Sequence, residues 1–344
     1  MSPTDYTFAS DNVAGLHPQA LALLSEANEG VVAAYGEDAA TRNFEEALSS
    51  FFEMPVKAFL VFNGTAANAL SLASLVKPYE AVACHRHAHA DLDECNAPEF
   101  FTGGAKLIPI DGKNGKVGPK MLEAKLQERD DVHFPKIRAL TLTLSSEVGT
   151  VYTLSELAEL KEVCQKYRVR VHLDGARFFN ALAALGGQPG DCIRASGADV
   201  LSLGLVKIGA ALGEGVVFFD EPLSDGFAYR RKQAAQLSSK MRFISAPIPT
   251  LIKADIVDWA RHANTMASSL GNGFRALGIE PVFPVEANAV FVRLKEDVAQ
   301  RLRGEGWVFY DFVENTQRFV CHWGTTAQNI ERLLSDVQRI SASQ

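Results

Sequence analysis

The chain has 344 residues, of which 47% are hydrophobic and 22% are charged, and its formal net charge is −7. Such a chain can bury a large core and is expected to divide into two domains, because single cores stop growing near about 250–300 residues. The negative net charge gives no sign of the clustered positive charge that binding to nucleic acid or acidic membranes needs. No apolar run reaches the roughly 20 residues of a membrane span, so we expect neither nucleic-acid nor membrane binding.

Cysteine usage indicates a reducing compartment. The chain has five cysteines, an odd number, and they are scattered without a C-x-x-C pair. This pattern supports neither a disulfide framework nor a zinc ribbon. We therefore expect a cytoplasmic protein.

Short apolar runs alternate with amphipathic segments over the first two thirds of the chain, which is typical of an α/β fold with a mostly parallel sheet. The predicted strands are 57–62, 81–85, 105–110, 137–144, 169–174, 199–204 and 214–220. The predicted helices are 66–76, 119–129 and 154–168. Ser155 is the expected N-cap of the last of these helices.

A smaller α+β domain is predicted after about residue 245. APIP at 246–249 interrupts the pattern, one long helix is predicted over 251–274, and strands are predicted within 288–294, 307–312 and 318–323. We therefore expect an N-terminal arm over 1–15, a large domain over 16–245 and a small C-terminal domain over 246–344.

The first polar feature at a strand end is the turn Asn63-Gly64-Thr65, which opens a helix. Backbone N–H groups at a helix N-terminus bind anions, and Thr65 adds a hydroxyl group. A plain strand-to-helix turn would show the same pattern. The spacing matches neither the P-loop nor the G-x-G-x-x-G fingerprint.

An acid and an amine follow two later strands. Asp174 ends a buried strand and therefore needs a partner, either Arg177 or a cationic group of a ligand. Lys207 interrupts the apolar run LSLGLVKIGAALGE at 201–214. It either extends to the surface or is a desolvated amine suited to a Schiff base. An anion site, an acid and an amine at one sheet edge together match the needs of pyridoxal phosphate.

The segment HRHAHADLDEC at 85–95 places histidines at alternate positions, 85, 87 and 89. In an extended segment these side chains would lie on one side, which raises the possibility of a metal site. The alternatives are a solvated polar loop, or one imidazole that serves a cofactor as a stacking group or base. Spacing alone does not make ligands converge, and we predict no metal site.

Longer motifs are spread over nearly the whole chain. They are SDN (10–12), YGED (35–38), FNGTAANALSLASL (62–75), DECNAPEFFTGGAKL (93–107), EVGTVY (147–152), HLDGARFFNALAALG (172–186) and KQAAQLSSKMRF (232–243). With the lysine run, they resemble the low-specificity L-threonine aldolases. The resemblance implies a fold-type-I enzyme that uses pyridoxal phosphate, with a large domain and a smaller C-terminal domain. It also implies a homotetramer built from dimers, with active sites at subunit interfaces.

The resemblance implies a set of cofactor-binding residues. Lys207 would form the Schiff base with the cofactor, and Asp174 would pair with its protonated pyridine nitrogen. Gly64 and Thr65 would hold the phosphate. Arg177 would bind substituents of the ring.

Further roles follow from the same resemblance. His89, five residues before a glutamate, would stack on the pyridine ring. Tyr35 would reach the phosphate from a neighbouring subunit. Ser10 and Arg318 would bind the substrate carboxylate, for which an arginine can make a bidentate contact, and Arg242 is a further candidate for this polar shell.

The chain departs from the family pattern at three places. Around the lysine it has GLVKIG (204–209) where the family commonly has GGTKNG, so polar partners beside the Schiff base are missing. GVVAAYG (30–36) lacks a histidine before the tyrosine, and CHWGTT (321–326) lacks an aspartate near the glycine.

The resemblance implies cleavage of β-hydroxy-α-amino acids to glycine and an aldehyde. Substrates would include L-threonine, L-allo-threonine and phenylserine-type amino acids. His89, directly or through a water, would remove the β-hydroxyl proton before the Cα–Cβ bond breaks. The alternatives are other lyase or transaldolase chemistry with the same cofactor, or a homologue without catalytic activity.

Overall fold

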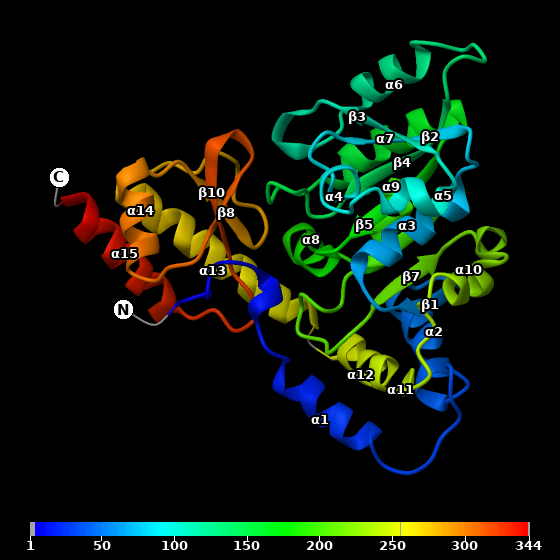
Figure 1. Cartoon of the computed structure of the whole chain (residues 1–344), viewed down its shortest axis with the longest axis horizontal. Coiled ribbons are helices and arrows are strands. Elements are labelled where there is room, and N and C mark those ends of the chain that lie inside the picture. Colours follow the sequence, from blue (N-terminus) through cyan, green and yellow to red (C-terminus); the bar gives the residue numbers. More distant parts are fainter. Residues whose placement is uncertain (1–3, 255, 343–344) are drawn as a thin grey trace.

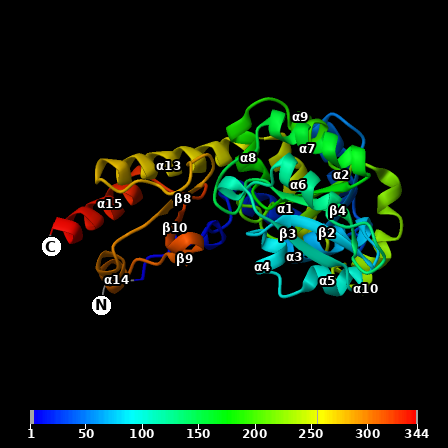
Figure 2. The ribbon, with the colours of Figure 1, turned by 90° about the horizontal axis from the view of Figure 1, so that it is seen from above.

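The structure is a computed structural model that describes residues 4–254 and 256–342. It consists of a large α/β part around a seven-stranded sheet and a smaller part around a three-stranded antiparallel sheet (Figure 1). Helix α13 (Ile256–Ala276) runs from one part to the other, as the view from above shows (Figure 2). The predicted fold class, a mostly parallel sheet with a smaller C-terminal α+β region, is confirmed.

The central sheet has the strand order β1-β7-β6-β5-β4-β2-β3. Its strands are β1 (Lys57–Val61), β2 (Glu80–His85), β3 (Lys106–Ile110), β4 (Lys136–Thr143), β5 (Arg170–Gly175), β6 (Val200–Leu203) and β7 (Glu214–Phe218). Strand β7 is antiparallel to both of its neighbours, β1 and β6, and the other pairs are parallel. Strand β1 therefore runs in the same direction as β5 and β6, and their carboxyl ends share one edge.

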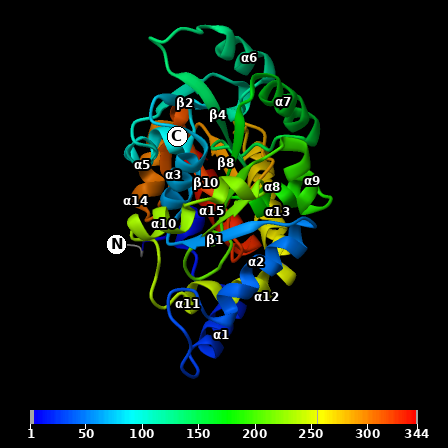
Figure 3. The same cartoon turned by 90° about the vertical axis from the view of Figure 1, so that its right-hand side faces the viewer.

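Helices cover both faces of this sheet, and most residues of its strands are buried (Figure 3). Helices α3, α5 and α10 lie on one face, where Phe218 and Phe227 are buried, and α2, α7, α8 and α9 lie on the other. The helices of this part are α1 (Pro18–Ala27), α2 (Ala39–Phe52), α3 (Gly64–Leu75), α4 (His89–Leu92), α5 (Ala97–Thr102), α6 (Pro119–Gln127), α7 (Leu154–Tyr167), α8 (Phe178–Leu185), α9 (Pro189–Ser196), α10 (Phe227–Gln233), α11 (Arg242–Ser245) and α12 (Pro247–Lys253).

Two local predictions were wrong. The N-cap of α7 is Thr153, not Ser155, because Thr153 and Glu156 form a reciprocal capping box. The single helix predicted over 251–274 is two helices, α12 and α13, because Ala254 is extended (φ −89°, ψ −153°). Residue 255, within that predicted helix, lies outside the described residues.

The smaller part packs α14 (Glu296–Gly304) and α15 (Ala327–Ala342) against β8 (Ala289–Val292) and β10 (Thr316–Val320), and β9 (Tyr310–Phe312) pairs with β10. The N-terminal segment joins it: the Asp5 amide donates to the Gly306 carbonyl at 2.8 Å, and Phe8 is buried in its core. The first half of α13 packs into the large core and the second half into the small one. The boundaries at residues 15 and 245 stay a prediction.

No helix within the described ranges is long and apolar enough to cross a lipid bilayer.

Candidate active site

A cavity of about 300 Å³ opens at the carboxyl edge of the central sheet, where ligands bind in folds of this kind. Residues of the large part form most of its wall, and the N-terminal segment and the smaller part add the rest. The predicted site residues that line it are Ser10, Gly64, His89, Asp174, Arg177, Lys207 and Arg318. Segments from the whole length of the chain therefore meet in one site.

Lys207 lines this cavity from the loop between β6 and β7 and is half-buried. Among the described residues, no hydrogen bond or ion pair to its amine is present. The loop itself is tightly held, because a Cβ atom at Gly204 would lie 2.3 Å from a backbone oxygen of Ala176. The carboxylate of Glu214 also accepts the backbone N–H groups of Leu205 and Val206. The amine thus faces the site on a fixed backbone, as a Schiff-base lysine requires.

Asp174 belongs to a buried hydrogen-bond network, and it does not pair with Arg177. The amide nitrogen of Asn68 donates to Asp174 Oδ2 at 2.9 Å and to Glu94 Oε1 at 2.7 Å. Glu94 Oε1 in turn contacts His89 Nδ1 at 2.8 Å. The side-chain amide of Asn68 therefore connects Asp174, the acid predicted to pair with the pyridine nitrogen, with Glu94, the carboxylate that contacts His89.

The hydrogen bond that Glu94 accepts from His89 raises the pKa of His89 to about 9, even though burial opposes this shift. His89 therefore carries its proton at neutral pH. A protonated imidazole can stack on a ring and donate hydrogen bonds, but it cannot take a further proton. The base role predicted for His89 stays a prediction, and its raised pKa does not favour that role.

The histidine-rich segment is not extended. His85 ends β2 and contacts the Gly112 carbonyl oxygen at 3.1 Å, a turn follows at 86–87, and His89 begins α4. Within the part of the chain that the structure describes, no group of three or more histidine, cysteine or acidic side chains is placed to hold a metal ion.

Arg177 forms a bidentate ion pair with Asp11, with Nε to Oδ2 at 2.7 Å and Nη2 to Oδ1 at 2.9 Å. The side chain of Asn288 also donates to Asp11 at 3.0 Å. Asp11 is 2% exposed. Burial alone would raise its pKa, but the charge and hydrogen bonds of Arg177 outweigh burial and hold the pKa at about 2. This pair fixes the N-terminal segment, and with it Ser10, against the cavity.

Besides Lys207, Arg318 on β10 is a cation in the wall that forms no ion pair with an acidic side chain among the described residues. Its Nε atom is buried without a hydrogen bond, and its guanidinium lies 4.9 Å from the centre of the Phe312 ring. Burial lowers the pKa of this arginine, but a guanidinium stays charged throughout the physiological range. A buried, unpaired donor next to a cavity is suited to a carboxylate ligand.

Three predicted site residues do not line the cavity of the single chain. Thr65 follows Gly64 in the first turn of α3. Tyr35 is 50% exposed, and Arg242 donates to the Glu29 and Gly30 carbonyl groups. Their predicted roles at the phosphate and the substrate stay predictions.

Several residues with a place in the site were given no role from the sequence: Asp11, Asn68, Glu94, Glu147 and Glu214. Four of them lie inside the quoted motifs and Glu214 ends the lysine run, so the resemblance marked all five segments. Nothing in the sequence indicated which partner each side chain contacts.

The fold and the cavity together define a pyridoxal-phosphate-dependent enzyme of fold type I. A lysine-to-alanine variant of a serine palmitoyltransferase from S. paucimobilis, with a bound aldimine of pyridoxal phosphate and myriocin, shares the fold, with a TM-score of 0.70 and 18% identity, over 100% of this chain and 88% of that chain. A threonine aldolase from Leishmania major superposes with a TM-score of 0.91 and 25% identity, over 98% of this chain and 99% of that chain.

The sequence comparisons are more specific. The family model for beta-eliminating lyases matches residues 7–297. The chain is 42% identical to the low specificity L-threonine aldolase of Pseudomonas aeruginosa, over 98% of this chain and 99% of that protein. The chain belongs to the beta-eliminating lyase family and, within it, to the low-specificity L-threonine aldolases.

Proposed function

We propose that the protein cleaves β-hydroxy-α-amino acids, among them L-threonine and L-allo-threonine, to glycine and an aldehyde with the help of pyridoxal phosphate. The observation that carries this proposal is the meeting of Lys207, Asp174 and the unpaired Arg318 in one cavity. An amine, a buried acid and a free guanidinium are the groups that this cofactor and an amino-acid substrate need.

The side chains present fit the cofactor. Lys207 would hold it through its amine, Asp174 would lie at its pyridine nitrogen, and the N-terminus of α3 would receive its phosphate. A Cβ atom at Gly64 would meet nothing within 4 Å, so this helix end is open to a ligand. When bound, pyridoxal phosphate supplies a conjugated, electron-poor ring that accepts the electron pair released at Cα.

The chain's own residues would orient the substrate. Arg318 and Ser10 would bind its carboxylate. The orientation that this contact imposes on the substrate would determine which bond at Cα is aligned with the cofactor ring. Breaking Cα–Cβ rather than Cα–H therefore depends on Arg318. Protonated His89 would cover the ring and, with its charge, stabilise negative charge nearby.

The test is chemical labelling combined with product analysis. The purified holoenzyme is reduced with borohydride, and peptide mass spectrometry shows whether a pyridoxyl group is fixed to Lys207. L-threonine, phenylserine and serine are then supplied, and glycine and aldehyde are measured. We expect the label on Lys207 and glycine from the first two. A protein that takes up no cofactor would be a non-catalytic homologue, and pyruvate from serine would indicate β-elimination instead.

The assembly is part of the same proposal. Tyr35 and Phe62 are about half exposed on the single chain, and Tyr35 lies outside its own cavity. This supports a homotetramer of dimers in which Tyr35 serves a neighbouring site, and light scattering of the purified protein measures its mass. Because every described cysteine is free, we also propose that the enzyme works in the reducing cytoplasm.

A further inference from the structure

Four carboxylates line the cavity: Asp93, Glu147, Asp174 and Glu214. Asp174 is hydrogen-bonded in the network with Asn68, Glu214 holds the backbone of the lysine loop, and Asp93 is exposed. Glu147 has none of these functions. It lies in the motif EVGTVY, to which no role was attached.

Glu147 follows β4 and reaches the cavity beside His89. Its Oε1 atom accepts the backbone N–H of His89 at 3.3 Å. This is the one hydrogen bond of its side chain within residues 4–254 and 256–342. The second carboxylate oxygen is therefore available to a ligand in the cavity.

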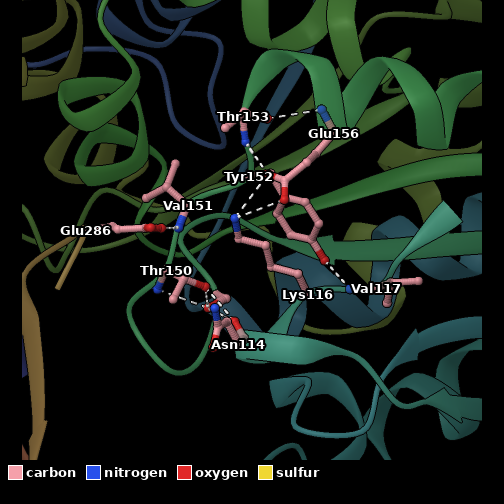
Figure 4. A network of polar contacts seen from close by, with 10 residues as sticks. Asn114, Lys116, Val117, Thr150, Val151, Tyr152, Thr153, Glu156 and Glu286 are labelled. Carbon is pink, nitrogen blue, oxygen red and sulfur yellow. Dashed lines mark hydrogen bonds and ion pairs between the residues drawn. The ribbon is translucent and has the colours of Figure 1, made fainter. Parts of the chain in front are cut away.

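The loop that carries Glu147 is held at both ends. At its start, the Leu144 amide donates to the Asp174 carbonyl at 2.8 Å. Beyond Glu147, Thr150 donates its hydroxyl to the Asn114 carbonyl at 2.6 Å, and the Val151 amide donates to Glu286 at 2.7 Å (Figure 4).

Figure 4 also shows that the loop runs directly into the anchored start of α7. The Tyr152 hydroxyl accepts the Val117 amide at 2.6 Å, and Glu156, which caps α7, pairs with Lys116 at 3.0 Å. A carboxylate on such a backbone is fixed before substrate binds, and preorganisation of this kind is what acid–base groups need.

Charged groups face Glu147 from several elements. They are Asp174 at the end of β5, His89 of α4, Arg177 before α8, Lys207 after β6 and Arg318 on β10. Burial, together with the charge of Asp174, raises the pKa of Glu147 to about 6, against the opposing effect of the cations. The carboxylate is thus ionised at neutral pH and basic enough to take a proton there.

We propose that Glu147, rather than His89, accepts the β-hydroxyl proton during cleavage of the amino acid. This inference rests on the proposed function. The proton moves to a Glu147 oxygen, and the O–H electron pair becomes the second bond of the aldehyde C=O group. The Cα–Cβ bond breaks, and its electron pair remains at Cα, where the electron-poor ring of bound pyridoxal phosphate would stabilise it. Glycine forms when Cα takes up a proton.

Glycine itself provides the control reaction, because it has no β-hydroxyl group. Exchange of its α-proton with deuterated water uses the cofactor and the carboxylate site but needs no base at Cβ. We would compare wild type, Glu147→Gln, Glu147→Asp, His89→Gln and, as a matched carboxylate on the exposed face of α7, Glu159→Gln. For each holoenzyme, threonine cleavage is followed from about pH 5 to pH 9, and glycine exchange is followed by NMR.

We expect Glu147→Gln to lower kcat for threonine cleavage about 100-fold or more, while glycine exchange changes by less than about threefold. The fall of kcat/KM on the acid side, near pH 6, should disappear in this variant and persist in Glu159→Gln. Glu147→Asp should recover part of the activity.

Three results would overturn the assignment. The first is threonine cleavage by Glu147→Gln within about threefold of wild type, and the second is an equal loss of cleavage and glycine exchange in this variant. The third is that the fall of kcat/KM on the acid side disappears in His89→Gln instead. The second of these would show that Glu147 positions the cofactor. A wild-type enzyme that exchanges glycine but cleaves no β-hydroxy amino acid would instead refute the proposed function.

Discussion

Replacing Asp11 by alanine tests the ion pair that joins the N-terminal segment to the cavity. The change leaves the buried guanidinium of Arg177 without its bidentate partner and removes an acceptor of Asn288. Breaking a buried pair from one side costs about 3–5 kcal/mol, because a desolvated charge is left behind. The unfolding entropy of a 344-residue chain is about 0.7 kcal/mol/K at ~2.1 cal/mol/K per residue. The expected loss in Tm is therefore about 4–7 °C.

The assay is thermal unfolding followed by circular dichroism at neutral pH. Asp130→Ala is the control, because it breaks an exposed pair with Lys136 and should leave Tm unchanged. The double variant Asp11→Ala/Arg177→Met should recover most of the loss, since no buried charge remains. A Tm within about 1 °C of wild type for Asp11→Ala, or a double variant less stable than the single one, would refute this reasoning.

The same pair predicts a pH dependence. The pKa of Asp11 is lowered from 3.8 to about 2 in the folded protein. A group with a lowered folded pKa stabilises the fold above its unfolded pKa, and this contribution is lost as the pH falls toward the folded value. The Tm difference between wild type and Asp11→Ala should thus be constant above about pH 4 and shrink as the pH falls from 4 to 2. A constant difference across that range would contradict the assignment of the stabilisation to the charged pair.

Three further substitutions test other parts of the site. Glu94→Gln removes the carboxylate behind His89, so the pKa of His89 should fall from about 9 toward its usual 6.5, as measured by NMR of labelled histidine. Gly204→Ala places a Cβ atom 2.3 Å from a backbone oxygen and should destabilise the chain by about 1–3 kcal/mol in denaturant unfolding, whereas Gly118→Ala, with open space around it, should not. Arg318→Met should raise KM for L-threonine about 10–100-fold and leave the Kd of the cofactor unchanged, since a charge-assisted contact contributes about 1.5–3 kcal/mol.

The sequence predicted those parts of the site that depend on one strand at a time. Gly64, Asp174 and Lys207 each follow an apolar run, and strands of one direction deliver their carboxyl ends to one edge. The positions of these residues therefore followed from local periodicity together with one topological rule. The reversed direction of β7 could not be predicted from the sequence, because an apolar run in a sheet covered on both faces has the same pattern in either direction.

Partners that come from distant segments could not be predicted in the same way. Arg177 meets Asp11 across 166 residues, and Asn288 meets the same carboxylate across 277. Asp174 is closer to Arg177 in the sequence than Asp11 is, and burial alone did not show which of these two carboxylates pairs with Arg177. The choice is made by packing, because Asn68 already satisfies Asp174 from inside the core.

The setting of Lys207 shows how a departure from the family pattern can be compatible with the same site. Val206 and Ile208 stand where the family pattern has a threonine and an asparagine, and Leu205 stands where it has a glycine. The sequence therefore predicts a site with fewer hydrogen bonds. In the structure, the polar contact comes from outside the loop, since Glu214 accepts backbone N–H groups that exist whatever side chains the loop carries. Burial raises the pKa of Glu214 to about 7, and the charge of Lys207 opposes this shift. The apolar side chains can therefore pack into the core while the carboxylate on β7 fixes the backbone that presents the amine.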